Sequence, residues 1–249
     1  MTTSKSIPLR LYFIRHGETG WTISGQHTGR TDIPLTAHGE DEARELVPRI
    51  RDSAFAHVLT SPLERARRTC ELLGLGGVAK IEPDLAEWDY GDYEGRRSAD
   101  IREGRPDWNL FRDGPPHGET PAQISNRADR VIAGLRGLDG NVALFSHGHF
   151  GRVLAARWIG LSVESAQYLL LSTASLSVLC YEHDQTDQPA IALWNSSARP
   201  FDQEPDQCAG NTRLMQERAI QRWDNEGGGI PQRAARRGEQ HAAMEGMTA

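Results

Sequence analysis

The sequence is poor in lysine, and its charge balance is acidic. Lys5 and Lys80 are the only lysines, so nearly all of the 28 basic residues are arginine, and 34 acidic residues leave a net charge of −6. This balance argues against a nucleic-acid binder that works through a broad basic face. It still allows a small anion to be held in one local basic pocket, where arginine suits phosphate well.

The sequence also has few cysteines and no long hydrophobic run. Cys70, Cys180 and Cys208 are widely spaced and form no C-x-x-C pair, which disfavours a disulfide framework or a zinc site and fits a reducing compartment. The apolar run at residues 9–14 is too short for a signal core or a membrane span. We therefore expect a cytoplasmic protein that contacts neither membrane nor nucleic acid.

Short buried strands alternate with amphipathic helices along most of the chain. Strands are predicted at 9–14, 55–60 and 141–145, with a closing pair at 175–181 and 190–194. Helix-start signals stand at Thr36, at Ser61 followed by a proline, and at Thr120 followed by a proline, and a further helix is predicted at 153–159. This alternation predicts an α/β fold with a mainly parallel sheet flanked by helices on both faces.

The domain organisation follows from where this pattern stops. Residues 1–200 are predicted to form one domain, with the irregular stretch 95–118 as a short lid over the site. Residues 201–249 are polar, contain few large apolar side chains, and are predicted to be a poorly ordered tail.

Basic and imidazole side chains follow the predicted core strands. Arg15 and His16 follow the first strand, Arg65 lies in the helix after the second, and His147 follows the strand at 141–145. Because the carboxyl ends of parallel strands border one crevice, these four side chains are expected to meet there. Guanidinium groups match phosphate oxygens, and a neutral histidine can attack phosphorus when its other ring nitrogen finds an acceptor and nearby cations keep it unprotonated.

A leaving alkoxide needs a proton, and residues 85–91 offer carboxyl groups in an aromatic setting. We predict that Glu87 supplies it, with Asp89 and Glu18 as rivals, because burial can raise the pKa of a glutamic acid toward the working range. An acid that must start protonated predicts activity favoured at mildly acidic pH. His147 and His149 lie two residues apart without a marked third ligand, so no metal site is predicted.

These segments together resemble the histidine phosphatase superfamily, in the branch that includes cofactor-dependent phosphoglycerate mutase. The matching motifs are R-H-G-E-T at 15–19, G-Q-H-T-G-R-T-D-I-P-L-T at 25–36, S-P-L-E-R-A at 61–66, A-E-W-D-Y-G at 86–91 and S-H-G-H at 146–149. The resemblance covers residues 8–195. Residues 87–95 and 146–158 look most like a broad-specificity mycobacterial acid phosphatase, and the loop at 24–36 also looks like sedoheptulose-bisphosphatase relatives.

The resemblance implies a role for each matching residue. It makes His16 the nucleophile, Arg15 and Arg65 the phosphate clamps, His147 the stabiliser of the transition state, and Glu87 the proton donor and later the base for water. The implied substrate-binding set is Arg15, Thr22, Thr28, Gly29, Arg65, Glu87, Tyr90 and Gly148. No cofactor is implied; the expected partner is a small phosphorylated molecule, and a homodimer is left as an open alternative.

The sequence departs from the family pattern in two places: the first weakens the carry-over of a role to Thr22, and the second favours hydrolysis. Thr22 stands where the family often has asparagine, and Ser98 stands where the mutases carry a lysine in a longer covering insertion. A short lid with few cations should admit water to a phosphohistidine. We therefore predict a phosphomonoesterase, with a phosphoglycerate mutase, a sugar bisphosphatase or a catalytically silent phosphate-binding module as alternatives. His27 is left open as a substrate contact, and His149 is expected to be structural.

Overall fold

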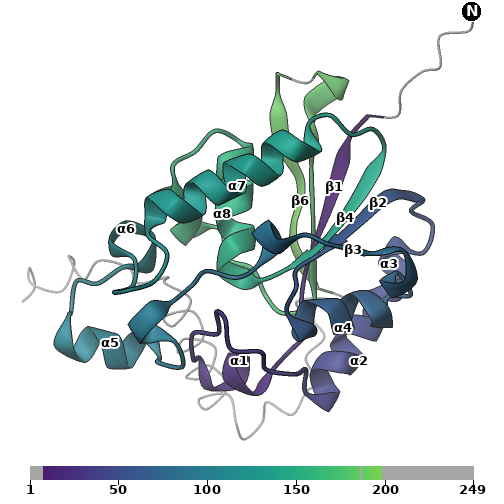
Figure 1. The fold of residues 1–249 in the computed structure, drawn as a ribbon. Coiled ribbons are helices and arrows are strands. Elements are labelled where there is room, and N and C mark those ends of the chain that lie inside the picture. The colour runs from purple at the N-terminus through teal and green to yellow at the C-terminus, as the bar shows by residue number, and fades with distance from the viewer. Residues whose placement is uncertain (1–7, 186, 198–249) are drawn as a thin grey trace, which may run out of the picture.

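The computed structural model describes residues 8–185 and 187–197 (Figure 1). In this part of the chain the strands form one sheet. Its order is β3 (Lys80–Ile81), β2 (Phe55–Thr60), β4 (Asn141–Ser146), β1 (Arg10–Arg15), β5 (Ser175–Tyr181) and β6 (Pro189–Ser197). The first four are mutually parallel, and β5 is antiparallel to both β1 and β6. The predicted mainly parallel sheet and its closing pair are confirmed.

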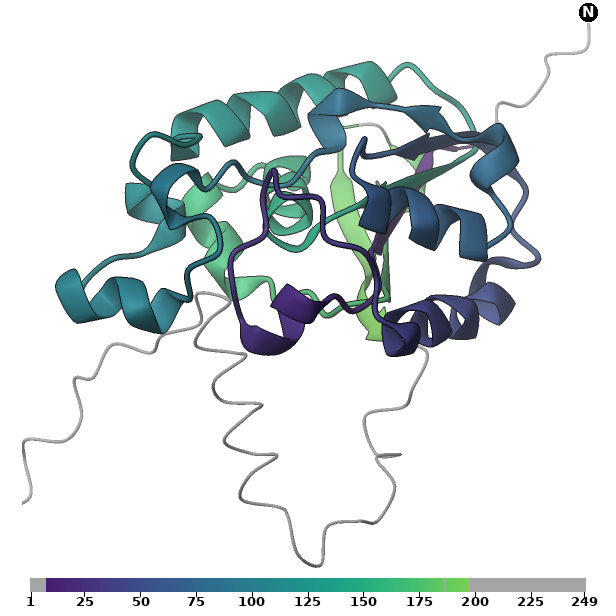
Figure 2. The ribbon, with the colours of Figure 1, turned by 60° about the horizontal axis from the view of Figure 1, so that its bottom comes forward.

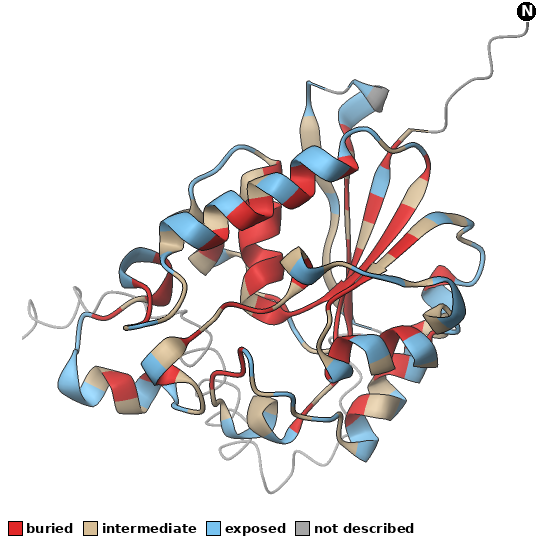
Figure 3. Cartoon of the chain, viewed as in Figure 1, coloured by how far each residue is buried: buried red, intermediate tan, exposed pale blue. Residues whose placement is uncertain are grey.

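Both faces of the sheet are covered by helices, as predicted (Figures 1 and 3). The helices of one layer are α7 (Pro121–Leu135) and α8 (Gly148–Trp158); those of the other are α2 (Ala37–Glu45), α3 (Val47–Ile50) and α4 (Glu64–Leu72). Successive side chains of a strand point to opposite faces. Leu11 and Phe13 of β1 accordingly join the core beside α7 and α8, whereas Ile14 joins the core beside α2 to α4.

Threonine caps fix the starts of two helices as the sequence predicts. Thr36 caps α2 by accepting from the Gly39 N–H, and Thr120 forms a reciprocal capping box with Gln123 at the start of α7. Pro48 lies in the first turn of the short helix α3, which follows α2 after Leu46; a proline is tolerated there because the N–H it lacks would have no partner inside the helix.

Two helix starts were predicted wrongly. Ser61 does not cap α4, because the helix begins only at Glu64, whose N–H donates to Asp32 Oδ1 at 2.8 Å; the Ser61 hydroxyl accepts from Leu63 N–H at 3.3 Å and is bonded to His147 Nε2 at 2.7 Å. The helix predicted at 153–159 begins earlier, at Gly148. Gly151 does not break it, because this glycine serves close packing: a Cβ there would lie 2.4 Å from the ring of Phe13.

Short helices collect at the carboxyl end of β1, and two of them, α5 and α6, come from the stretch 95–118 that was predicted as a lid (Figures 1 and 2). They include α1 (Gly20–Ser24), η3 (Gly91–Tyr93), α5 (Ser98–Gly104) and α6 (Leu110–Asp113). The remaining short helices are η1 (Gly76–Val78), η2 (Pro83–Leu85), η4 (Val163–Tyr168) and η5 (Glu182–Asp184). Within the described ranges, no helix has the length and apolar character needed to cross a membrane. The predicted tail at 201–249 lies outside the described residues.

Candidate active site

The register of the sheet brings the two predicted histidines together. Arg15 of β1 is paired with Ser146 of β4, so His16 and His147 are the next residues on adjacent strand ends. The backbone N–H of His16 donates to the Ser146 carbonyl at 3.1 Å, and the imidazole centroids lie 5.2 Å apart. Sequence segments more than a hundred residues apart therefore meet at the carboxyl edge of the sheet, as expected for this fold class.

The protonation pattern of His16 is set by its backbone. Its Nδ1 lies 2.7 Å from the carbonyl oxygen of Gly17, which can only accept, so Nδ1 carries the hydrogen and Nε2 keeps a lone pair. Burial lowers the pKa of His16 well below its usual value, and the guanidinium groups of Arg65 and Arg15 lower it further. His16 is thus held as a neutral imidazole.

The two arginines differ in what they contact. Arg65 is fully buried and donates from Nη2 to the carbonyls of Thr28 and Gly29, at 2.9 and 3.1 Å. It fixes the loop that borders the site. Arg15 donates from Nη1 to the Leu171 carbonyl, and its guanidinium lies against Gly148, where an added Cβ would be 3.0 Å from Cζ. Arg15 lines the open cleft, whereas Arg65 lies beneath it.

His147 is a neutral link between Arg65 and Ser61. Arg65 donates from Nε to His147 Nδ1 at 3.2 Å, so the hydrogen of the ring is on Nε2 and is donated to the Ser61 hydroxyl. Burial lowers the pKa of His147 well below its usual value, and the charge of Arg65 adds to the effect.

Glu87 is the carboxylate of the cleft. Its Oε1 accepts from the backbone N–H groups of Trp88 and Phe150, at 2.9 and 2.8 Å, and its Oε2 accepts from His149 N–H at 3.1 Å. Two of these donors belong to the first turn of α8, where anionic groups are stabilised. Oε2 carries only one of the three contacts and therefore has capacity left for a proton or a ligand.

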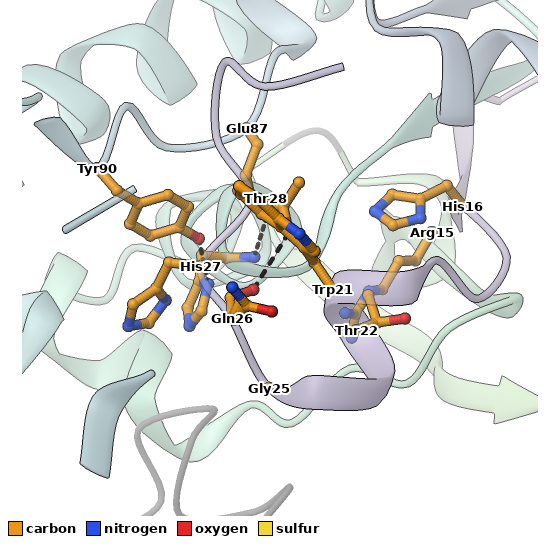
Figure 4. Close-up of a pocket in the computed structure, with 11 residues that line it drawn as sticks. Arg15, His16, Trp21, Thr22, Gly25, Gln26, His27, Thr28, Glu87 and Tyr90 are labelled. Carbon is orange, nitrogen blue, oxygen red and sulfur yellow. Dashed lines mark hydrogen bonds between the residues drawn. The ribbon is translucent and has the colours of Figure 1, made fainter. Parts of the chain in front are cut away.

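The cleft has a volume of about 60 Å³ and is shown in Figure 4. Its lining residues are Arg15, His16, Trp21, Thr22, Gly25, Gln26, His27, Thr28, Glu87, Tyr90 and His149. Of the predicted site residues, Arg65, His147 and Gly29 lie behind this lining, and Gly148 borders a smaller neighbouring cavity together with Arg15. The Thr22 hydroxyl is bonded within the α1 cap, accepting from Thr19 N–H at 2.8 Å.

The rival acids lie outside the cleft. Asp89 is paired with Arg30 at 2.8 Å, and Glu18 accepts from the Thr36 hydroxyl at 2.8 Å. Glu87 is therefore the one carboxylate among the described residues that line the cleft. In the same part of the chain, no three His, Cys, Asp or Glu side chains are grouped so that they could hold a metal ion.

Sequence reasoning missed the residue that supports the Glu87 segment. Arg127 of α7 donates to the carbonyls of Asp84, Ala86 and Glu87, at 2.8, 2.6 and 3.2 Å, and forms a buried pair with Glu119. One arginine inside an amphipathic helix looks like a solvated charge, so its sequence position alone gives no signal. The sequence analysis also did not predict Trp21 and Gln26, which line the cleft from the loop before Thr28.

Comparisons with known proteins agree with this geometry. A family model described as "Histidine phosphatase superfamily (branch 1)" matches residues 11–197. The chain is 40% identical over 189 residues to an acid phosphatase of Mycobacterium tuberculosis, covering 74% of this chain and 92% of the relative. It is 34% identical over 267 residues to sedoheptulose 1,7-bisphosphatase of Saccharomyces cerevisiae, covering 81% of this chain and 97% of the relative. The solved structure of a Mycobacterium tuberculosis open reading frame product aligns with a TM-score of 0.72 at 35% identity, covering 76% and 98% of the two chains.

Proposed function

The chain belongs to branch 1 of the histidine phosphatase superfamily and is a phosphatase, and from this premise we propose that it hydrolyses phosphomonoesters through a phosphohistidine on His16. The observation that carries the proposal is the hydrogen bond from His16 Nδ1 to Gly17, because it leaves Nε2 as a nucleophile in the cleft that Glu87 also lines. We further propose that the reaction needs no metal ion and takes place in the cytoplasm.

The first step transfers the phosphoryl group to the protein. His16 Nε2 attacks phosphorus, the P–N bond forms, and the ester P–O bond breaks. Arg15 binds the phosphoryl oxygens, and spreading their charge over fixed guanidinium donors supplies most of the catalysis in phosphoryl transfer. The leaving alkoxide takes a proton from Glu87.

The second step returns His16 to its starting state. The Glu87 carboxylate takes a proton from water, the resulting hydroxide attacks phosphorus, and the P–N bond breaks to release inorganic phosphate. We expect His147 to turn its Nε2–H from the Ser61 hydroxyl toward a phosphoryl oxygen when substrate binds, since its ring lies 5.2 Å from that of His16 on the adjacent strand end.

A screen of phosphorylated metabolites, run with a chelator present, tests the proposal. Phosphate release is expected to persist with the chelator and to vanish in His16→Ala, while His38→Ala, a substitution at an exposed histidine of α2, keeps full turnover. Loss of turnover on chelation would contradict the metal-independent mechanism. A pH profile in which activity rises steadily above neutrality would contradict Glu87 as an acid that starts protonated.

Ser98 gives a specific reason to prefer hydrolysis over a mutase reaction. It occupies the position of the mutase lysine, is buried, and its hydroxyl lies 3.2 Å from His27 Nε2 rather than offering a charge to the cleft. Supplying 3-phosphoglycerate with a trace of 2,3-bisphosphoglycerate separates the two reactions. Free phosphate is the expected product, and 2-phosphoglycerate would favour the mutase.

A further inference from the structure

The cleft has two chemically different ends. Arg15 and His16 lie at one end, and Gln26, His27 and Tyr90 lie at the other, with Trp21 and Glu87 between them (Figure 4). In the proposed reaction the phosphoryl group occupies the first end, between the nucleophile and its guanidinium partner. The alcohol part of the substrate must then extend past Glu87 toward the second end.

Within the described part of the chain, the lining of the second end holds no arginine or lysine. Arg15 is the only arginine or lysine among the described residues that line the cleft, and it is at the phosphoryl end. The second end presents the amide of Gln26, the imidazole of His27 and the phenol of Tyr90 instead, with the imidazole of His149 bonded to that phenol. Burial, helped by the charge of Arg102, lowers the pKa of His27 to about 4, so its ring is neutral at neutral pH.

The arginines of the surrounding lid are directed to other partners. Arg30 pairs with Asp89 at 2.8 Å, Arg97 pairs with Asp100 at 2.5 Å, and Arg96 lies over the Tyr93 ring at 5.4 Å. Arg102 donates from Nε to the Trp108 carbonyl at 3.4 Å. A second anionic group on a substrate would therefore find no arginine or lysine in the described lining of the second end to receive it.

The second end is also held in shape by its own contacts. The His27 ring stacks on Tyr90, with centroids 4.6 Å apart, and the Tyr90 hydroxyl is bonded to His149 at 2.6 Å. Gln26 is fixed by donating from Nε2 to the Gly95 carbonyl at 2.7 Å. These contacts hold neutral side chains in the lining of the second end.

We infer that the enzyme selects monoesters that carry a single phosphate and whose alcohol part bears no negative charge. This inference rests on the proposed function and names its substrate class. It sets the chain apart from a sugar bisphosphatase or a phosphoglycerate-specific enzyme, because both of those must accommodate a second anionic group.

Matched substrate pairs test the inference in the full-length protein. In the first pair, glycerol 3-phosphate has a hydroxymethyl group where 3-phosphoglycerate has a carboxylate. In the second pair, fructose 1,6-bisphosphate has one phosphate more than fructose 6-phosphate. At neutral pH we expect kcat/KM to be at least about tenfold higher for the less charged member of each pair, because the second charge would be partly desolvated at an end of the cleft whose described lining holds no cationic side chain to pair with it.

Two substitutions of Gln26 make the test specific to charge. Gln26→Lys adds a cation at the second end, whereas Gln26→Met removes the same amide hydrogen bonds without adding charge. The ratio to compare is kcat/KM for glycerol 3-phosphate divided by kcat/KM for 3-phosphoglycerate. We expect Gln26→Lys to lower this ratio by about tenfold and Gln26→Met to leave it as in the natural protein.

The outcomes separate this inference from the function it rests on. Equal or higher kcat/KM for the charged members, with turnover that still depends on His16, would overturn the inference and keep the phosphatase reaction. A ratio that moves equally in Gln26→Lys and Gln26→Met would also overturn it. No turnover on any of the four esters would overturn the proposed function, and this inference with it.

Discussion

Replacing Arg127 with methionine removes the side chain that holds the Glu87 segment against α7. Arg127 donates to three carbonyls of residues 84–87 and pairs through Nη2 with Glu119 at 2.6 Å. The two paired side chains are only 10% and 14% exposed, so the substitution leaves the Glu119 carboxylate buried without its partner. Breaking a buried pair in this way costs roughly 3–5 kcal/mol, whereas methionine keeps much of the packing on Phe150.

Urea unfolding measures this cost against a control on the same helix. Arg130 also contacts the segment, pairing with Asp84 at 3.0 Å, but its side chain is 60% exposed. Arg130→Met should therefore lower the free energy of unfolding by less than about 1 kcal/mol, against about 4 kcal/mol for Arg127→Met. Adding Glu119→Gln to Arg127→Met should recover part of the loss, because the unpaired charge is removed.

The same variant tests whether Arg127 positions Glu87 for proton donation. An activated aryl phosphate has a leaving group that needs little help from an acid, whereas an alkyl phosphate depends on it. We expect Arg127→Met to reduce kcat for the alkyl ester more than for the aryl ester. The reasoning is refuted if Arg127→Met destabilises the protein no more than Arg130→Met and lowers both rates equally.

Three further predictions concern the site itself. Gly17→Ala should abolish most activity, because the added Cβ would lie 2.2 Å from the Gly39 carbonyl oxygen. Gly20→Ala is the control and should keep the normal rate, because the space around Gly20 is open. Equal rates for the two variants would contradict the close packing of this loop. Glu87→Gln should lower alkyl-phosphate turnover by about 10²–10⁴-fold and aryl-phosphate turnover less, and a uniform loss would argue against an acid role. The pKa of His27 falls from 6.5 to about 4 on folding, so the unfolded chain binds the extra proton between these values. The free energy of unfolding therefore falls as pH is lowered from 6.5 toward 4, by roughly 3 kcal/mol for this one group. The urea midpoint of His27→Gln should fall less steeply over this pH range than that of the natural protein. Equal slopes for the two proteins would contradict the lowered pKa of His27.

The sheet and the starts of α2 and α7 were predictable because they depend on local signals. Apolar strand-forming runs gave β1, β2 and β4, and the Thr120–Gln123 capping box gave the start of α7. Ser61 shows where local signals fail. Its sequence context is that of a helix cap, but its hydroxyl is taken by His147, a residue distant in sequence that the fold brings to it.

The site was predictable to the extent that it lies on strand ends. Because β1 and β4 are adjacent and parallel, residues just after them had to share one edge, which placed His16 beside His147. The residues that hold the site in place from other parts of the fold could not be predicted from the sequence. Arg127 reaches its partners from α7 across a tertiary contact, and the depth of Arg65 below the cleft depends on how the loop at Thr28 folds over it.

The central claim is that His16 Nε2 becomes covalently bonded to phosphorus during turnover. Rapid acid-free quenching of the enzyme during steady-state hydrolysis, followed by mass spectrometry of its peptides, tests this directly. The account predicts one added phosphoryl group on the peptide that contains His16, stable in alkali, lost in acid and absent in His16→Ala. A phosphorylated residue elsewhere, or full turnover by His16→Ala, would contradict it.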